Sequence, residues 1–201
     1  LGKIHFTDNY DKYENALMNL FTEFFDLFVS DKVYFKVRTY EFKMLRTIKK
    51  ELFGTEIFTN ALEIGCGFGY NSFLLTPFCK NITSLDIPEE YAVFKNKMSK
   101  ELSCKNSISV ANYISKHIDG CKIEFQTSFF KEIDLPDNSV DFIYSGYVLE
   151  HIPDLLSVVE ELSRIAKRDC LMIHVVPTTN AHIIPFLGMN FIPFRKAFLI
   201  I

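Results

Sequence analysis

The stretch Leu62–Gly69, which reads Leu-Glu-Ile-Gly-Cys-Gly-Phe-Gly, decides the fold of this chain. It has the apolar residues of a buried strand, and these run into three glycines, Gly65, Gly67 and Gly69. Because glycine has no Cβ, the backbone of such a loop can turn sharply and approach a ligand closely. A strand followed by a glycine-rich loop and then a helix is typical of nucleotide sites in open α/β sheets. The stretch therefore predicts a nucleotide-binding loop.

Glu63 narrows the kind of ligand that this loop is expected to bind. Its carboxylate lies beside the loop, where it would repel a pyrophosphate and attract a cation. The dinucleotide fingerprint G-x-G-x-x-G also requires Gly or Ala at the position that Tyr70 occupies here. We therefore favour a nucleoside-like ligand with a positive charge over a nicotinamide or flavin dinucleotide. A glycine loop that serves only the turn is the remaining alternative.

Composition and charge fit one domain of an ordinary globular protein. The chain has 201 residues, of which 48% are hydrophobic and 23% charged, and a formal net charge of −3. This charge gives no electrostatic reason to expect a DNA or RNA partner. We find no signal peptide and no transmembrane span. Because the chain opens on Leu1 and stops in an apolar segment, we expect it to be a fragment.

Cysteine usage indicates a reducing, cytoplasmic compartment. The five cysteines are scattered and form no C-x-x-C pair, at Cys66, Cys79, Cys104, Cys121 and Cys170. An odd number without metal-ligand spacing argues against a disulfide framework and against a zinc site.

Apolar periodicity predicts strands that alternate with helices. Strand-like apolar runs cover residues 57–64, 82–87, 122–127, 140–145 and 170–176. Helical spacing is found at residues 14–29, 35–53, 70–79, 108–117 and 154–166, and Pro88 opens a further helix. This alternation predicts an α/β, Rossmann-like, doubly wound and mostly parallel sheet with helices on both faces. We divide the single domain 1–201 into a helical cap (1–54), a ligand-binding core (55–177) and a C-terminal part (178–201).

The helix at residues 35–53 is expected to have one apolar and one basic face. The apolar face contains Val37, Tyr40, Met44, Leu45, Ile48 and Leu52. The basic face contains Lys36, Lys43, Arg46, Lys49 and Lys50, and a solvated surface is a better interpretation of it than a docking surface.

Asp86 ends the second predicted strand and is the next candidate site residue. An acid at this place can accept both hydroxyls of a ribose through its two oxygens. A lone strand-end aspartate is more often a cap or a turn former, but its position one strand after the glycine loop favours the ribose.

Two further segments carry a resemblance to a known family. Residues 136–141 read Pro-Asp-Asn-Ser-Val-Asp, and residues 145–154 read Ser-Gly-Tyr-Val-Leu-Glu-His-Ile-Pro-Asp. Together with the glycine loop they resemble class I S-adenosylmethionine (SAM)-dependent methyltransferases, which have Glu/Asp-x-Gly-x-Gly-x-Gly and then Val-Leu-Glu-His-hydrophobic-Pro-Asp. The match covers roughly residues 59–177 in the expected order, so residues 55–177 would be the SAM-binding core.

The resemblance implies a role for each cofactor-binding residue. Glu63 would face the amino group and methionine part of SAM, Asp86 would hold the ribose, and Ile87 would pack on the adenine. The family usually has an aspartate at the adenine corner, where this chain has Ser128 or Phe129. The full predicted cofactor site is Glu63, Gly65, Cys66, Gly67, Gly69, Asp86, Ile87, Ser128, Phe129 and Ser145.

The same resemblance points to candidate catalytic residues. His151 would lie beside the methyl group and is a candidate general base, with a structural role as the alternative. Tyr147 could line the acceptor pocket. Relatives that bind a divalent cation carry Glu-x-x-Glu-His, but the first Glu is Tyr147 here, and Glu150 with His151 alone are too few ligands. His174 and His182 are further candidate ligands, but we expect no metal.

The acceptor is the least determined part of the predicted function. We expect a small organic acceptor, methylated at oxygen, nitrogen or carbon in that order of preference. The Phe-rich tail after residue 177 suits an apolar acceptor or peripheral contact with a membrane, or forms a core helix, and we expect the family's last two strands to be missing. The alternatives are a catalytically silent SAM-binding domain and an RNA methyltransferase, which the lack of a basic stripe beyond residues 36–50 disfavours.

Overall fold

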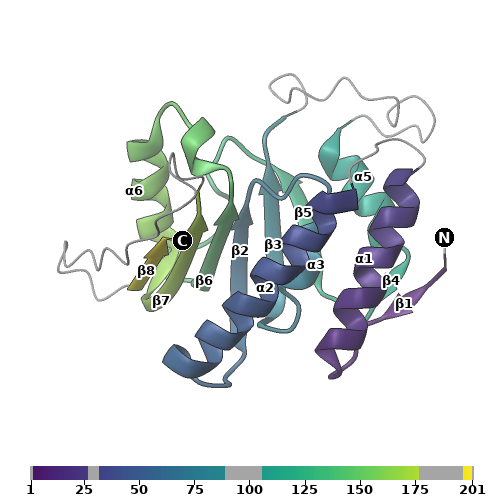
Figure 1. Ribbon diagram of the computed structural model, residues 1–201. Coiled ribbons are helices and arrows are strands. Elements are labelled where there is room, and N and C mark those ends of the chain that lie inside the picture. The colour runs from purple at the N-terminus through teal and green to yellow at the C-terminus, as the bar shows by residue number, and fades with distance from the viewer. Residues whose placement is uncertain (1, 27–31, 89–105, 177–196, 201) are drawn as a thin grey trace.

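The computed structural model describes residues 2–26, 32–88, 106–176 and 197–200 (Figure 1). One sheet in this part of the chain has six strands, in the order β5 (Ile123–Thr127), β3 (Cys79–Asp86), β2 (Phe58–Ile64), β6 (Val140–Gly146), β7 (Ala166–Val175) and β8 (Ala197–Ile200). Every neighbouring pair is parallel. The predicted α/β, mostly parallel sheet is confirmed.

The strand order reverses at the centre of the sheet. From β2 the chain moves outward through β3 to β5, then returns to place β6 on the other side of β2. The last residue of β2, Ile64, pairs with Leu85 of β3 and with Ser145 of β6. The loops that leave β2 and β6 therefore diverge at their carboxyl ends, which is where open α/β sheets bind their ligands.

Helices cover both faces of the sheet (Figure 1). One face packs against α1 (Tyr10–Asp26), α2 (Lys32–Phe53), α3 (Tyr70–Leu74) and α5 (Ser107–Ser115), and the other against α6 (Leu155–Ile165). Alternate residues of each strand serve the two faces. Ala61 and Tyr144 belong to the first core, while Leu62, Ile64 and Ile143 belong to the core under α6.

Tyr70 explains why the loop departs from the dinucleotide pattern. Its ring is buried and lies 4.8 Å from the ring centroids of both Phe21 and Phe35. Its hydroxyl is 2.5 Å from Thr39 Oγ1. This side chain joins the start of α3 to α1 and α2, a role that Gly or Ala could not fill.

Helix α3 ends earlier than predicted. The expected helix at residues 70–79 stops at Leu74, and β3 begins at Cys79 rather than at residue 82. Pro77 has no N–H to donate and disfavours helical backbone in the residue before it. The chain instead makes a turn in which Phe78 N donates to Leu75 O at 2.8 Å.

Short strands near both ends of the chain were missed. β1 (Ile4–His5) pairs with β4 (Ile118–Asp119) in a second parallel sheet. The core-helix alternative for the tail is wrong at residues 197–200, which form β8 beside β7. Strands of two to four residues are too short to display a period. The helix expected to open at Pro88 lies almost wholly outside the described residues.

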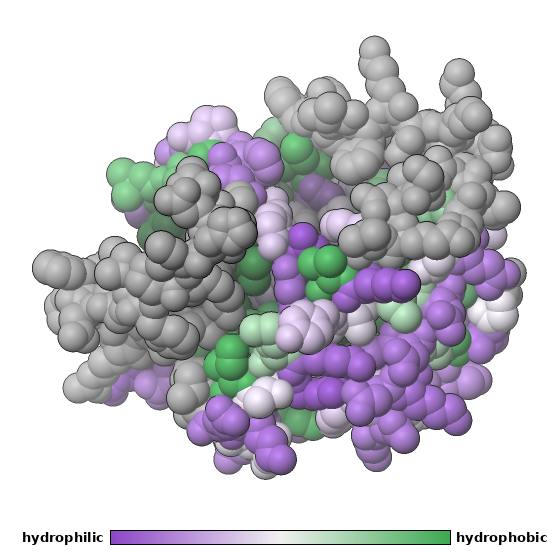
Figure 2. Space-filling view, viewed as in Figure 1, coloured by the Kyte–Doolittle hydropathy of each residue, from purple (hydrophilic) through white to green (hydrophobic). Residues whose placement is uncertain are grey.

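The predicted apolar face of α2 is wrong in part. Val37, Tyr40 and Met44 are 42%, 65% and 43% exposed, whereas Phe35 and Phe42 are buried. Figure 2 shows hydrophobic side chains at the surface along this helix, among hydrophilic ones. The helix has apolar residues on most of its circumference, and packing selects the aromatic face that the period alone does not distinguish.

The predicted basic face of α2 is not simply a solvated surface. Lys49 is buried and donates to the carbonyl oxygens of Gly54, at 3.1 Å, and Glu56. Arg46 Nη1 lies 2.6 Å from Oε1 of Glu14, which is 1% exposed. Lys49 thus fixes the C-terminal end of α2, and Arg46 joins α2 to α1.

Replacing Arg46 with methionine is expected to lower the free energy of unfolding by about 3 kcal/mol, because Glu14 would remain buried without its nearest cation. Burial already raises the pKa of Glu14. The deficit should therefore shrink as the pH falls and the carboxylate becomes protonated. Urea denaturation measures the effect. Adding Glu14→Leu should recover much of the loss, and equal stability of Arg46→Met and the unmodified protein would contradict the account.

Candidate functional site

The glycine loop has a left-handed backbone at each of its three glycines. The φ angles of Gly65, Gly67 and Gly69 are 70°, 52° and 84°. A Cβ on Gly65 would lie 2.2 Å from the Val148 side chain, and one on Gly69 would lie 2.9 Å from the Phe125 ring. A Cβ on Gly67 would meet no atom within 4 Å. Gly65 and Gly69 thus allow close packing within the protein, and Gly67 leaves space beside the backbone.

Glu63 is a buried carboxylate with one unused oxygen. It is 0% exposed, and its Oε2 accepts hydrogen bonds from Ser84 Oγ, at 3.0 Å, and from Ser72 Oγ. Its Oε1 has no hydrogen-bond partner. Burial raises the pKa of Glu63 to about 7. A buried acceptor without a partner is costly, and a cationic ligand would relieve the cost.

Asp86 lies at the end of β3, as expected, and its two oxygens are already oriented by the chain. Oδ1 accepts from Ile87 N at 2.8 Å, and Oδ2 accepts from Ser107 Oγ at 3.0 Å. Burial raises the pKa of this carboxyl group. A carboxylate has about four acceptor sites, so Asp86 can still accept a hydrogen bond from a ligand.

Ser128 and Phe129, which are predicted to contact the adenine, lie in the loop after β5. Ser128 N donates to Asp86 O at 2.8 Å, which places the start of this loop next to the end of β3. The Ser128 hydroxyl accepts from Phe130 N at 3.1 Å. Phe129 is 49% exposed, while Phe130 is buried in the core under α6. Of the two aromatic residues, Phe129 is the exposed one.

Two predicted site residues at the end of β6 have different hydrogen-bond partners. Ser145 is buried, and its Oγ lies 2.8 Å from Nδ1 of His174, whose pKa burial lowers to about 4. Tyr147 has a φ of 60° and donates from its hydroxyl to Glu41 Oε1 at 3.0 Å. The predicted acceptor-side tyrosine is thus tied to α2.

His151 lies in a 3-10 turn, Leu149–His151, shortly after the end of β6. Its side chain is 77% exposed, and Nε2 lies 3.9 Å from Glu150 Oε1. Among the described residues, no group of three His, Cys, Asp or Glu side chains could hold a metal ion. The described cysteines form no disulfide with one another; they are Cys66, Cys79, Cys121 and Cys170. Cys104 lies outside the described residues.

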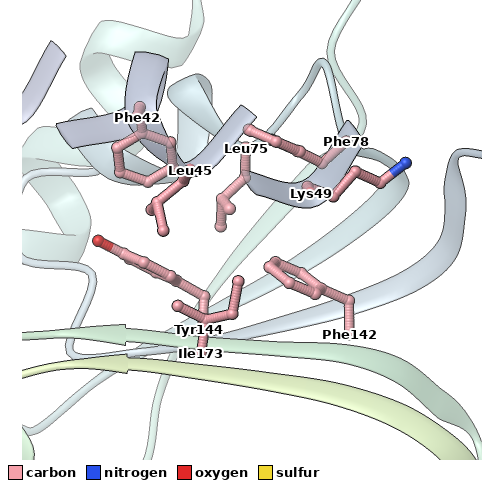
Figure 3. A pocket seen from close by; sticks show the side chains of 8 residues that line it. All are labelled: Phe42, Leu45, Lys49, Leu75, Phe78, Phe142, Tyr144 and Ile173. Atoms are coloured by element: carbon pink, nitrogen blue, oxygen red, sulfur yellow. The ribbon is translucent and has the colours of Figure 1, made fainter. Parts of the chain in front are cut away.

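A small internal cavity lies apart from these loops. It has a volume of about 10 Å³ and lies between α2 and strands β6 and β7, among the side chains labelled in Figure 3. Its walls are carbon atoms, and the amino group of Lys49 points out of it. A space of this size holds no more than about one water molecule, so it is a packing defect under α2.

A family model described as "Methyltransferase domain" matches residues 62–173, more than half of the chain. The chain belongs to the class I SAM-dependent methyltransferases. Its residues fit the cofactor, since the unpaired Glu63 Oε1 suits a cation and Gly67 leaves room for a ligand against the backbone. Ser72, Ser84 and Ser107, which hold the two acids, were not predicted, because serine at such spacings has no distinctive sequence pattern.

Curated relatives of this methyltransferase chain are distant. A demethylmenaquinone methyltransferase of Listeria welshimeri is 25% identical over 142 residues, which cover 69% of this chain and 50% of the relative. A probable SAM-dependent methyltransferase of Mycobacterium tuberculosis is 23% identical over 141 residues, covering 70% of this chain and 44% of the relative. The chain spans about half the length of these relatives.

Solved structures support the methyltransferase fold. A protein of Pyrococcus horikoshii matches with a TM-score of 0.51 and 19% identity, covering 73% of this chain and 61% of that one. The YcgJ protein of Bacillus subtilis matches with a TM-score of 0.50 and 20% identity, covering 65% and 47%. None of the helices in the described ranges has the length and apolar character needed to cross a membrane.

Proposed function

We propose that this chain transfers a methyl group from SAM to a small organic acceptor, with oxygen preferred over nitrogen and carbon. The observation that carries the proposal is the buried Glu63 carboxylate with a free oxygen, next to the open backbone at Gly67. A dinucleotide would bring its pyrophosphate against this acid. A cationic nucleoside such as SAM meets both features.

The proposed chemistry is a single in-line displacement. When bound, SAM supplies a methyl group on a sulfonium, and the protein must position the acceptor atom at about 3 Å and exclude water. Glu63 and Asp86 are proposed to hold the amino-acid and ribose ends. Tyr147 is proposed to line the acceptor side.

His151 is proposed to take the acceptor proton. Its imidazole is exposed to solvent, and Nε2 lies 3.9 Å from Oε1 of Glu150. Within the described residues it makes no hydrogen bond that ties a helix to a loop, as the structural alternative would require. An acceptor bound at the end of β6 could contact this exposed imidazole directly.

The acceptor class is proposed from the relatives and from the sequence. One relative is named for demethylmenaquinone, and we propose a small aromatic acceptor of this kind. The Phe-rich segment 186–198 lies largely outside the described residues, so peripheral membrane contact through it remains a prediction. The cytoplasmic location also remains a prediction, as does the single domain 1–201 with its three parts.

Methyl transfer is tested by incubating the protein with SAM labelled at the methyl group and with a cell extract, then with a panel of phenols and quinols. We expect label in a small-molecule fraction, and none in protein or RNA. Label in RNA would favour the RNA alternative. Tight SAM binding without transfer to any component would favour the catalytically silent domain.

Replacing Gly67 with alanine is expected to weaken SAM binding at least about tenfold, because the added methyl occupies the space left beside the loop. The left-handed backbone adds a stability cost of about 1 kcal/mol. Gly54→Ala is the matched control, because Gly54 also has a positive φ, 77°, and no atom within 4 Å. Calorimetric titration should separate the two variants. Equal SAM affinities in both would show that Gly67 does not face the cofactor.

A further inference from the structure

Buried polar atoms without partners gather under α2, beside Glu63. They are Glu63 Oε1, Asn71 Oδ1, Tyr144 Oη and Arg38 Nε. All four residues are less than a tenth exposed. A Cβ on Gly146 would lie 2.8 Å from Tyr144 Oη and 3.3 Å from Asn71 Nδ2, so these two groups meet over the end of β6. Unsatisfied buried groups are costly, and several in one place indicate a site for a polar ligand.

Arg38 is held by contacts that leave its Nε atom without a hydrogen-bond partner. Its Nη1 donates to Glu41 Oε2 at 2.7 Å, and the guanidinium stacks 3.8 Å from the ring centroid of Tyr147. The ring of Tyr34 lies 5.2 Å away. The Arg38 Nε atom has no hydrogen-bond partner. The Nε and Nη2 groups of an arginine form a fork that matches a carboxylate.

The charges of Arg38 and Glu63 shift the pKa values of the same two tyrosine hydroxyls. Burial raises the pKa of Tyr34 and of Tyr144, the charge of Glu63 raises both further, and the charge of Arg38 lowers both. The cation and the anion therefore both lie within electrostatic range of the buried Tyr144 hydroxyl. Figure 3 shows that the Tyr144 hydroxyl points away from the apolar cavity that its ring lines. Two buried groups of opposite charge on either side of one hydroxyl would be complementary to a zwitterion.

We propose that Arg38 binds the α-carboxylate of the methionine part of SAM while Glu63 binds its ammonium group. The inference rests on the proposed function and deepens it. It assigns a cofactor-selecting residue to α2, outside the matched residues 62–173. Asn71 and Tyr144 complete the polar wall between the two charges. Because Arg38 also contacts Tyr147, α2 would join the cofactor side to the acceptor side.

The test compares two nucleosides that differ in the amino-acid end. S-adenosylhomocysteine carries the zwitterion, and methylthioadenosine lacks it. Arg38→Met should weaken binding of S-adenosylhomocysteine about 10- to 100-fold, the value of a lost hydrogen-bonded charge pair. Binding of methylthioadenosine should change less than about twofold. Lys36→Met, which removes an exposed cation from the same helix, should change neither affinity.

The ratio of the two affinities protects the test against partial unfolding, because loss of folded protein lowers both equally. Arg38→Lys should keep the charge and lose the fork, and so fall between the other two proteins. An unchanged ratio in Arg38→Met would overturn the inference and leave the proposed function intact. Failure of the unmodified protein to bind either nucleoside would overturn the proposed function, and the inference with it.

Discussion

Replacing Asp86 with alanine is expected to lower the affinity for SAM by at least about 100-fold. The carboxylate is proposed to accept both ribose hydroxyls, and each charge-assisted hydrogen bond is worth about 1.5–3 kcal/mol. A loss of about 1.4 kcal/mol corresponds to a tenfold change in affinity. Calorimetric titration measures the effect directly.

The control for this variant is Ser107→Ala. Ser107 donates to Asp86 Oδ2 at 3.0 Å, so its removal leaves the carboxylate and frees one lone pair. The affinity should then change less than about threefold. If Asp86→Ala bound SAM as tightly as Ser107→Ala, the ribose would lie elsewhere.

Replacing Glu63 with glutamine is expected to weaken binding of S-adenosylhomocysteine at least about tenfold at pH 8, because the amide cannot pair with an ammonium group as a carboxylate does. In the unmodified protein the affinity should rise with pH, since the pKa of Glu63 is about 7 and the charged form binds the cation. The variant should lose this part of the pH dependence. Titrations at pH 6, 7 and 8 measure both effects.

Glu63→Gln should weaken binding but raise the stability of the folded protein. Burial raises the folded-state pKa of Glu63 above its ordinary value, so the folded state binds an extra proton between the two pKa values. The contribution of Glu63 to stability is therefore lost as the pH rises through about 7. Glu63→Gln should melt at a higher temperature than the unmodified protein at pH 8, with a smaller difference at pH 5. A lower melting temperature of the variant at pH 8 would contradict the assigned burial cost.

The positions of the site acids were predictable because buried parallel strands leave a clear trace in a sequence. The run 57–64 became β2, Phe58–Ile64, and the run 140–145 became β6, Val140–Gly146. Such strands are apolar on both faces and end at glycine or polar residues. Once the strands are placed, Glu63 and Asp86 follow, because the ends of parallel strands share one edge of the sheet.

The rest depends on contacts that a local pattern does not record. Nothing around Arg38 in the sequence indicates that it faces Tyr147, which is far along the chain. Ser107 reaches Asp86 from the start of α5, and Arg46 reaches Glu14 across a helix pair. The end of α3 is different, because Pro77 was a readable signal for a helix stop.

The most direct test of the account is a calorimetric titration of the unmodified protein with SAM and, separately, with NAD. The account predicts saturable binding of SAM at a single site and no binding of NAD, because Glu63 and Tyr70 disfavour a pyrophosphate in the loop. Binding of NAD, or no detectable binding of SAM, would contradict the central claim that the loop at residues 63–69 holds a cationic nucleoside.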